Sequence, residues 1–331
     1  MAKVTVLTAV YNAEPYLRQC LDSLKNQTLK DCQFICIDDC STDASYNILQ
    51  EYAHADTRFQ VVRTPVNSGI AVTRNLGLQF ARGEFITMLD ADDWFSPDAL
   101  EKAYDMQIKG DGECVLFQLV MHEEENGHES IYPIKSTQNS WSGEEAFRMS
   151  LAGDIHGLYV ARADLYRRFP YDTTTPLYSD ENSTHLHYLN ANTVTLCNGK
   201  YYYRQHTSSL THACSIRRFD RMAAQLSMKR QLEQLQLEDK QNLLNSYETH
   251  RWLNIVGCYW YYYQHQSCFT SKEHQEIKAL FARMLRTIER QRIPWHLKMK
   301  LGYYPYASYQ TFSWVEDFYF KTRMLLNTIL K

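Results

Sequence analysis

The sequence predicts an α/β fold, in which helices flank a mostly parallel central sheet and a helical region follows at the C-terminal end. Three observations support this class. Short apolar runs alternate with stretches of helical spacing through the N-terminal third of the chain. Acidic residues come directly after several of these runs. From residue 219 to 237 the chain contains neither Gly nor Pro and is rich in strong helix formers.

Length, charge and hydropathy narrow the class of protein. At 331 residues the chain is long enough for one large domain or two ordinary ones. The formal net charge of -3 argues against nucleic acid as the main partner, because phosphate binding needs a basic surface. A predicted strand opens the chain in place of a signal peptide, and no stretch approaches the ~18 apolar residues of a membrane span. We therefore expect a cytoplasmic protein, either free or peripheral at the inner face of the cell membrane.

The nine cysteines indicate neither a zinc site nor a disulfide framework. Only Cys32, Cys36 and Cys40 are regularly spaced, and no second Cys or His cluster accompanies them, as a zinc site would require. Cys36 also lies within an apolar run, where a buried thiol packs as a small hydrophobic group. The odd count favours reduced thiols in a cytosolic protein.

Strands and helices are predicted in turn along the N-terminal third. The predicted strands are short and apolar, as is typical of strands buried on both faces, and comprise residues 4–10, 34–37, 59–63 and 85–89. The predicted helices have apolar residues at helical spacing and comprise 16–27, a segment ending near Tyr52, and 71–81. Ser41, Thr42 and Asp43 offer capping oxygens to the second helix, and Gly83 follows the third.

The later part of the chain has a mixed pattern that becomes helical. Further strands are predicted at 113–121 and 201–204, and further helices at 219–237, 252–263 and 273–290. The periodicity changes near residues 213–218 without a flexible linker. We therefore predict two regions, 1–215 and 216–331.

Polar side chains follow the predicted strands at the points where these end. They are Tyr11 and Asn12, Asp38 and Asp39, and Asp90 to Asp93. Right-handed crossovers bring the carboxyl ends of parallel strands to one edge, where open α/β sheets bind ligands. We expect these side chains to converge on one crevice. Asp90 and Asp92 supply hard oxygen ligands suited to Mg²⁺ or Mn²⁺. An ion bound there could in turn bind a diphosphate group.

Five motifs occur in order between about residues 3 and 100. They are VYNAEPYL at 10–17, LKNQT at 24–28, IDDCSTD at 37–43, NSGIAVTRNLG at 67–77 and LDADD at 89–93. Together they resemble the serial motifs of family 2 glycosyltransferases, which are inverting enzymes with the GT-A fold. The resemblance implies transfer of a sugar from a nucleotide-sugar, with a UDP-sugar favoured. The implied acceptor is a glycan or lipid-linked molecule of surface polysaccharide synthesis.

The resemblance also divides the chain by function. It implies a GT-A catalytic domain over 1–215, with nucleotide-sugar binding in 1–95 and the acceptor half in 96–215. Residues 216–331 would form a helical, aromatic-rich extension. The chain lacks the Gln-x-x-Arg-Trp motif of processive synthases, which favours a single transfer per acceptor.

Matching positions in the family imply a set of nucleotide-binding residues. These are Ala9, Tyr11, Glu14, Asp38, Asp39, Arg74, Asp90 and Ala91. Tyr11 would flank the base, Asp39 would accept its imide N–H, and Asp90 would contact the ribose. For Asp38 or Asp39, helix capping is the structural alternative. Arg74 is expected either near the diphosphate or in an ion pair that supports the acidic loop.

The resemblance implies a metal ligand and a closing segment as well. Asp92 would bind the metal, and His206 would be a second ligand or a phosphate donor. Residues 203–211 resemble the family's closing motif, in which basic and hydroxyl side chains come over the diphosphate. His156 and His212 have less support as site residues.

An inverting transfer needs a general base that deprotonates the acceptor hydroxyl. In related enzymes this base belongs to an acidic pair, usually Glu-Asp. Here Asp180 and Glu181 occupy the matching place in reversed order. We predict Glu181 as the base, with Asp180 as the alternative catalytic residue. A surface acidic pair without a role in catalysis is the remaining interpretation.

Residues 290–331 combine basic and aromatic side chains. The basic residues are Arg290, Arg292, Lys298, Lys300, Lys321, Arg323 and Lys331, against only Glu316 and Asp317. This composition suits an anionic membrane surface. Alternatively, the aromatics pack the helical region onto the catalytic domain or onto a second subunit, as in a homodimer. We slightly favour packing or a homodimer through 290–331, because the stretch lacks a long amphipathic stripe.

Two other functions are consistent with parts of the pattern. A metal-dependent nucleotidyltransferase also places acidic residues at strand ends, but it needs a Gly-rich, basic loop after the first strand. Here that loop is YNAEP at 11–15. A catalytically inactive GT-A fold that acts as a scaffold is favoured only by the reversed order of Asp180 and Glu181.

Overall fold

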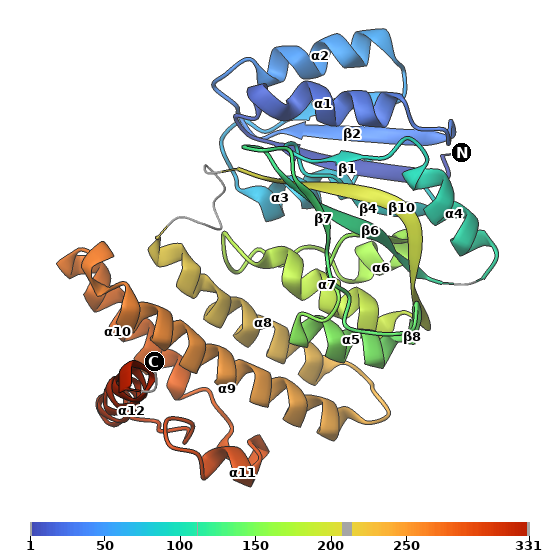
Figure 1. Cartoon of the computed structure of the whole chain (residues 1–331). Coiled ribbons are helices and arrows are strands. Elements are labelled where there is room, and N and C mark those ends of the chain that lie inside the picture. The colour runs from blue at the N-terminus through green and yellow to red at the C-terminus, as the bar shows by residue number, and fades with distance from the viewer. Residues whose placement is uncertain (1, 111, 207–213, 330–331) are drawn as a thin grey trace. The chain divides into compact units, whose positions relative to one another are not determined.

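The computed structural model describes residues 2–110, 112–206 and 214–329 (Figure 1). The chain divides into two compact units, Met1–Ser209 and Leu210–Lys331. Each unit has a hydrophobic core of its own side chains. The functions that we assigned to residues 1–215 and 216–331 stay predictions.

The first unit is built around a ten-stranded sheet. Its strands are β1 (Val4–Val10), β2 (Cys32–Asp38), β3 (Phe59–Arg63), β4 (Phe85–Met88), β5 (Trp94–Phe95), β6 (Cys114–Glu123), β7 (Glu129–Ile131), β8 (Ser140–Ser142), β9 (Tyr159–Arg162) and β10 (Thr193–Gln205). They run in the order β3-β2-β1-β4-β9-β6-β10-β5, with β7 paired to β6 and β8 to β10. The pairs from β3 to β4 are parallel, as is β6 with β10, whereas β9 is antiparallel to both neighbours. The predicted α/β class is confirmed.

Helices cover both faces of this sheet. One face carries α1 (Glu14–Lys25), α2 (Ser45–Ala55) and α4 (Ala99–Ile108), and the other carries α3 (Ile70–Leu78), α5 (Gly143–Ala152), α6 (Ala163–Arg168) and α7 (Ser179–Asn190). Figure 1 shows α1 and α2 on one side of β1 and β2, and α3 on the other. In β2, Phe34 and Cys36 enter the first core, while Ile35 and Ile37 enter the second. This burial on both faces explains why the strand is a continuous apolar run.

Two predicted helix ends in this unit are wrong. The helix predicted at 71–81 ends at Leu78, because the N–H groups of Phe80 and Ala81 donate to carbonyl oxygens three residues earlier, in a tighter turn. The helix predicted to end near Tyr52 continues to Ala55. Of its predicted capping residues, Asp43 accepts the N–H of Ser45 through Oδ1 (2.9 Å), whereas the Ser41 hydroxyl accepts the N–H of Asn12 (3.0 Å).

The second unit is helical, as predicted. Its helices are α8 (Asp220–Gln234), α9 (Lys240–Gln264), α10 (Ser271–Leu285), α11 (Trp295–Lys298) and α12 (Tyr309–Ile329). The helix predicted at 252–263 is only the second half of α9. In the first half, polar residues interrupt the apolar spacing, although Leu243, Leu244 and Tyr247 are buried. No described helix is both long and apolar enough to cross a bilayer.

Aromatic side chains form the core of the helical unit. Trp252 and Phe281 are fully buried, and Tyr259 lies with its ring centre 5.0 Å from that of Phe312. Phe312 and Phe320 bring α12 into this core. Part of the aromatic excess of the C-terminal region is therefore accounted for by packing.

Between these two phenylalanines, α12 buries a carboxyl group. The side chain of Glu316 is fully buried, and neither oxygen has a hydrogen-bond partner among the described residues. Burial, together with the neighbouring charge of Asp317, raises the pKa of Glu316 from 4.5 to about 8. Because the charged form is disfavoured in the folded state, the free energy of unfolding falls as the pH rises from about 4.5 to about 8.

Replacing Glu316 by Gln removes this ionisation and keeps the shape of the side chain. We expect E316Q to stabilise the protein at pH 8.5 by on the order of 1–3 kcal/mol, because a buried charge without a partner is lost. The gain should largely disappear near pH 4.5, where the wild-type carboxyl is protonated in the folded state and about half protonated in the unfolded state. Urea unfolding at both pH values measures it, with E276Q, which changes an exposed glutamate of α10, as the control. Equal stabilisation by E316Q at both pH values would contradict the assignment.

Candidate active site

An acidic loop follows β4 and is held in place by β10. The carboxylate of Asp93 is buried and accepts hydrogen bonds from the Tyr201 hydroxyl (2.8 Å) and the Arg204 N–H (2.8 Å). The N–H of Asp90 donates to the same tyrosine oxygen (3.2 Å). Burial raises the pKa of Asp93 well above its ordinary value, and Asp90 and Asp92 raise it further. Asp93 is therefore a structural acid that fixes the loop.

Arg204 is the second support of this loop. Its Nε donates to the backbone carbonyl oxygen of Asp92 (2.8 Å), and its guanidinium forms an ion pair with Glu124. The guanidinium carbon lies 5.0 Å from the ring centre of Tyr16 and 4.7 Å from that of Trp94. The resemblance implies only a general basic role for Arg204 in the closing motif, whereas the structure shows a buried side chain that holds the acidic loop.

These contacts leave the carboxylate of Asp92 partly exposed beside an imidazole. Asp92 is 39% exposed, and its Oδ2 lies 3.0 Å from Nε2 of His206. The His206 ring stacks on Tyr16, with 4.9 Å between ring centres. Two atoms suited to a divalent cation thus lie side by side. Among the described residues there is no group of three or more His, Cys, Asp or Glu side chains that would hold a metal alone.

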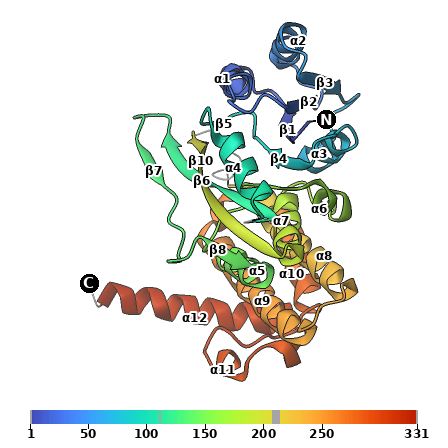
Figure 2. The ribbon, with the colours of Figure 1, turned by 90° about the vertical axis from the view of Figure 1, so that its right-hand side faces the viewer.

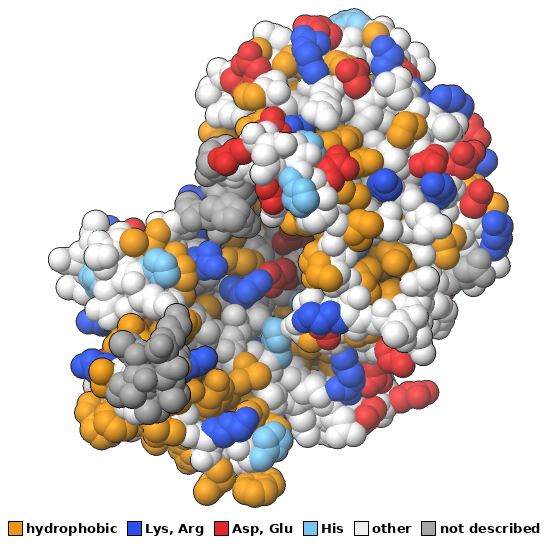
Figure 3. All heavy atoms as spheres, viewed as in Figure 1, with side chains coloured by type: hydrophobic (Ala, Val, Ile, Leu, Met, Phe, Trp, Pro, Cys, Tyr) orange, Lys and Arg blue, Asp and Glu red, His pale blue; other side chains and the backbone are white. Residues whose placement is uncertain are grey.

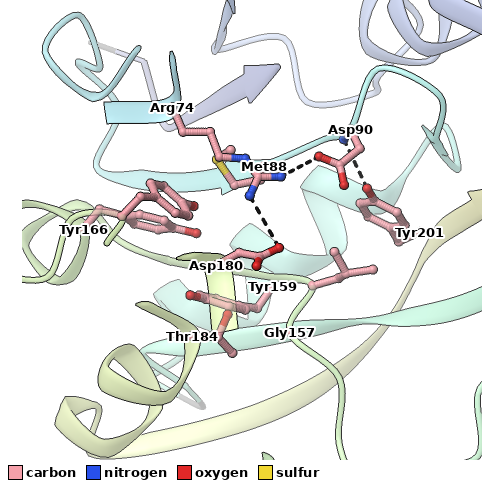
Figure 4. A pocket seen from close by; sticks show the side chains of 11 residues that line it. Arg74, Met88, Asp90, Gly157, Tyr159, Tyr166, Asp180, Thr184 and Tyr201 are labelled. Carbon is pink, nitrogen blue, oxygen red and sulfur yellow. Dashed lines mark hydrogen bonds and ion pairs between the residues drawn. The ribbon is translucent and has the colours of Figure 1, made fainter. Parts of the chain in front are cut away.

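Arg74, on α3, joins the acidic loop to a second acidic residue. Its Nη2 lies 2.6 Å from Oδ1 of Asp90, and its Nη1 lies 3.6 Å from Oδ2 of Asp180 (Figure 4). The guanidinium is buried beside the ring of Tyr171. Burial lowers the pKa of Arg74, but the carboxylates of Asp90 and Asp180 outweigh it and raise the pKa above its ordinary value. Arg74 therefore remains a cation between two carboxylates.

A pocket opens beside this ion pair. Its lining residues are Arg74, Met88, Asp90, Gly157, Leu158, Tyr159, Tyr166, Tyr171, Asp180, Thr184 and Tyr201. Figure 4 shows Asp90 and Asp180 approaching the guanidinium of Arg74 from different elements, with Tyr159 and Thr184 below Asp180. The pocket thus has a charged side and an aromatic side, a combination found in sites that bind sugars and nucleotides.

The aromatic side is fixed by a buried histidine. Nε2 of His187 lies 2.9 Å from the carbonyl oxygen of Phe169, so this nitrogen carries the proton. Its Nδ1 therefore accepts from the Tyr159 hydroxyl, at 2.6 Å. Burial lowers the pKa of His187 to about 4, which keeps the ring neutral. Nothing in the local sequence distinguishes His187 and Tyr159 from ordinary core residues, so neither is predicted as a site residue.

The acidic pair lies in the first turn of α7. Asp180 Oδ1 accepts the N–H of Glu181 (3.0 Å), and Asp180 lines the pocket. Tyr178, just before the helix, has φ of 65°, a left-handed conformation that costs energy for a non-glycine residue. The Asn182 amide donates to the carboxylate of Asp172 (2.7 Å), which anchors the same turn.

Asp39 and Asp38 follow β2, and their carboxylates already have protein partners. Asp39 Oδ1 accepts from the Thr64 hydroxyl and the Ser68 N–H, and its Oδ2 accepts from the Gly69 N–H, each at 2.8 Å. Asp38 is buried, and its Oδ2 lies 2.9 Å from Nε of Arg63. The Ser41 N–H also donates weakly to Asp38, at 3.3 Å. One acceptor direction of Asp39 is left for a ligand, so its predicted contact with a base stays a prediction.

The other predicted nucleotide-binding residues lie near the ends of β1 and β4. Tyr11 is half exposed at the end of β1, and Ala9 is partly buried within that strand. Oε2 of Glu14 accepts the N–H of Ala44 (3.0 Å), so this side chain supports the start of α2. Ala91 is buried between the aspartates of the acidic loop. Their contacts with a nucleotide stay predictions.

Comparison with known proteins identifies the family. Residues 5–173, just over half of the chain, match the family described as "Glycosyl transferase family 2". The chain belongs to this family. It is 37% identical over 166 residues to "Putative glycosyltransferase EpsH" of Bacillus subtilis (strain 168), covering 50% of this chain and 47% of the relative. It is also 40% identical over 106 residues to "Putative teichuronic acid biosynthesis glycosyltransferase TuaG" of the same strain, covering 32% and 42%.

A solved structure has a similar fold. The crystal structure of S. aureus TarS 1-349 in complex with UDP-GlcNAc is similar with a TM-score of 0.78 and 18% identity, covering 97% of this chain and 92% of that one. At this identity the likeness concerns the fold, and it confirms the predicted GT-A fold with a helical C-terminal region. The chain spans about half or less of the length of the first curated relatives that it matches.

The role of Tyr201 in holding the acidic loop can be tested by removing its hydroxyl. We expect Y201F to lower the free energy of unfolding by about 1.5–3 kcal/mol, because a hydrogen bond to a buried carboxylate is lost. The matched control is Y202F, whose hydroxyl makes no hydrogen bond with the described residues and whose ring stacks on Trp94. Urea unfolding of both variants measures the difference. Equal stabilities for Y201F and Y202F would refute the role.

Proposed function

We propose that this chain is an inverting glycosyltransferase that moves a sugar from a UDP-sugar to a glycan or lipid-linked acceptor in surface polysaccharide synthesis. One observation carries the proposal. Arg74 ties Asp90 of the acidic loop to Asp180 of the acidic pair at the edge of one pocket. The predicted donor-binding Asp90 and the turn of α7 that carries the acidic pair would thus lie close to the same substrate.

The donor and acceptor classes have support from similar proteins. TarS, which has a similar fold, has been solved in complex with UDP and with UDP-GlcNAc. Relatives include a teichuronic acid biosynthesis enzyme and a "Poly(ribitol-phosphate) beta-glucosyltransferase" of Bacillus spizizenii, 37% identical over 120 residues. Their names concern polymers of the cell surface. We carry this class of acceptor over to the chain as part of the proposal.

A divalent cation, Mg²⁺ or Mn²⁺, fits the residues beside the pocket. Asp92 and His206 would hold it with an exposed carboxylate oxygen and an imidazole nitrogen. Two protein ligands leave coordination positions for water and a diphosphate. When bound, the ion would neutralise the charge that develops on the leaving diphosphate. A fold-level neighbour, mannosyltransferase PcManGT from Pyrobaculum calidifontis, was solved with GDP-Man and Mn²⁺, at a TM-score of 0.54.

The chain's own residues would carry the proton transfer. The carboxylate of Glu181 would take the proton of the acceptor hydroxyl as that oxygen attacks the anomeric carbon from the side opposite the diphosphate. Asp180 suits this role less, because its Oδ2 lies 3.6 Å from Nη1 of Arg74 and its Oδ1 accepts the N–H of Glu181, so both oxygens already have partners in the protein. We propose that Asp180 instead positions the first turn of α7.

A catalytically inactive scaffold is the second candidate, and the reversed order of Asp180 and Glu181 favours it. A nucleotidyltransferase has less support, since the YNAEP loop after β1 is neither Gly-rich nor basic. Nucleotide and metal binding together with turnover distinguish the transferase from the scaffold.

Thermal-shift measurements with UDP, GDP, CDP and TDP, each with and without Mn²⁺, test the donor class. We expect UDP with Mn²⁺ to raise the melting temperature most, since a ligand at a hundred times its Kd stabilises by about 2.7 kcal/mol. D92N should abolish the metal-dependent part of the shift. The matched control is D105N, because Asp105 is an exposed aspartate on α4. The absence of a metal-dependent shift with every nucleotide would refute the transferase.

Substitutions in the acidic pair test the assignment of the base. We expect E181Q to lower kcat by about 10²- to 10⁴-fold while nucleotide affinity is kept, because only the proton acceptor is lost. D180N should change kcat less. Release of UDP from a panel of UDP-sugars, with water as the acceptor, measures both variants. Activity that survives E181Q but not D180N would move the base to Asp180.

A further inference from the structure

α12 has apolar side chains on two opposite faces. Phe312, Glu316 and Phe320 face the core of the helical unit and are buried. On the opposite face, Trp314 is 72% exposed and Phe318 is 56% exposed. At 100° per residue, Trp314, Phe318 and Leu325 fall on one narrow stripe. The helix thus places its carboxyl group inside and large apolar groups outside, the reverse of an ordinary surface helix.

Residues around α11 extend this exposed surface. Trp295 is 74% exposed and Met299 is 75% exposed, and Leu301 is exposed as well. The turn that follows lies against α12, because a Cβ on Gly302 would come within 2.5 Å of the Tyr319 ring. In the lower part of Figure 3, hydrophobic side chains gather over α11 and α12, and Figure 2 shows α11 beside α12.

The charges exposed along this surface are basic. We call it the outer face and define it by its exposed residues, which are Trp295, Met299, Lys300, Leu301, Trp314, Phe318, Lys321 and Leu325. The two acidic residues of the stretch lie elsewhere or have a partner. Glu316 is buried, and the carboxylate of Asp317 accepts a hydrogen bond from the Tyr259 hydroxyl (2.9 Å). The outer face is therefore both apolar and positively charged.

We propose that the outer face docks on an anionic lipid bilayer, with its tryptophans and Phe318 at the headgroup level and its basic side chains on the lipid phosphates. Tryptophan suits this interface because its ring is apolar and its N–H is polar. Lysine and arginine near an anionic leaflet add attraction that salt screens. The contact is peripheral, in keeping with the absence of a bilayer-spanning helix in the described part of the chain.

The charge of the outer face argues against a second copy as its occupant. A two-fold dimer would bring the same patch of both subunits together, so Lys300 and Lys321 would meet their own copies. Anionic phosphates would complement these cations. The sequence of 290–331 slightly favours packing or a homodimer. Packing accounts for Phe312 and Phe320, but it leaves Trp295, Trp314 and Phe318 uncovered.

Vesicle flotation with the full chain tests the proposal. Two kinds of vesicle are compared: pure phosphatidylcholine, and phosphatidylcholine with about one third phosphatidylglycerol. We expect binding to the anionic vesicles that weakens as salt is raised. The double variant W314S/F318S should lower the partition coefficient about tenfold or more. The charge reversal K300E/K321E should abolish the preference for anionic vesicles.

The matched control is I108S/I131S, which removes two exposed apolar side chains of the first unit. Thermal unfolding checks that all variants fold, and the nucleotide-dependent shift of W314S/F318S should equal that of the wild type. This readout separates failure of the docking proposal from failure of the proposed function. Equal loss of binding in I108S/I131S would overturn the proposal. So would the absence of binding to anionic vesicles, whether or not sedimentation then shows a dimer that W314S/F318S dissociates.

Discussion

Mutual repulsion among carboxylates is the constraint around which the first unit is organised. Asp90, Asp92 and Asp93 follow one strand, and Asp180 approaches from another element, so several negative charges share one edge of the sheet. Two arginines balance them. Arg74 lies between Asp90 and Asp180, and Arg204 holds the backbone of Asp92. Because these arginines are buried, their compensation of the negative charges depends on the packing around them and not on solvent.

Local sequence rules predicted the framework of this site but not its supports. β1 to β4 and the aspartates after them follow from apolar runs and from the geometry of parallel sheets. The partners of these aspartates lie far along the chain: Tyr201 is 108 residues from Asp93, and Arg204 is 112 residues from Asp92. Such contacts arise only when β10 pairs beside the loop. No periodicity or motif in a single sequence contains that information.

In the helical region too, the sequence alone does not determine which side chains are buried. Aromatic side chains at 312, 314, 318 and 320 look alike in sequence, yet two are buried and two are exposed. Their spacing fits either face of α12, so only the tertiary structure decides which face meets the core. The first half of α9 was missed for the opposite reason, since its polar residues hide a buried stripe. Composition predicted helices here, and packing set their faces.

The hydrogen bonds of Asp39 hold the loop after β3 in one conformation, which would affect how the protein binds a nucleotide. Its carboxylate holds the Thr64 hydroxyl and the N–H groups of Ser68 and Gly69, and Gly69 has the left-handed φ of 85° that this loop requires. The loop after β3 is thus ordered before any ligand arrives. Less conformational entropy is then lost on association, so this corner can act as a rigid template while other parts of the site adjust.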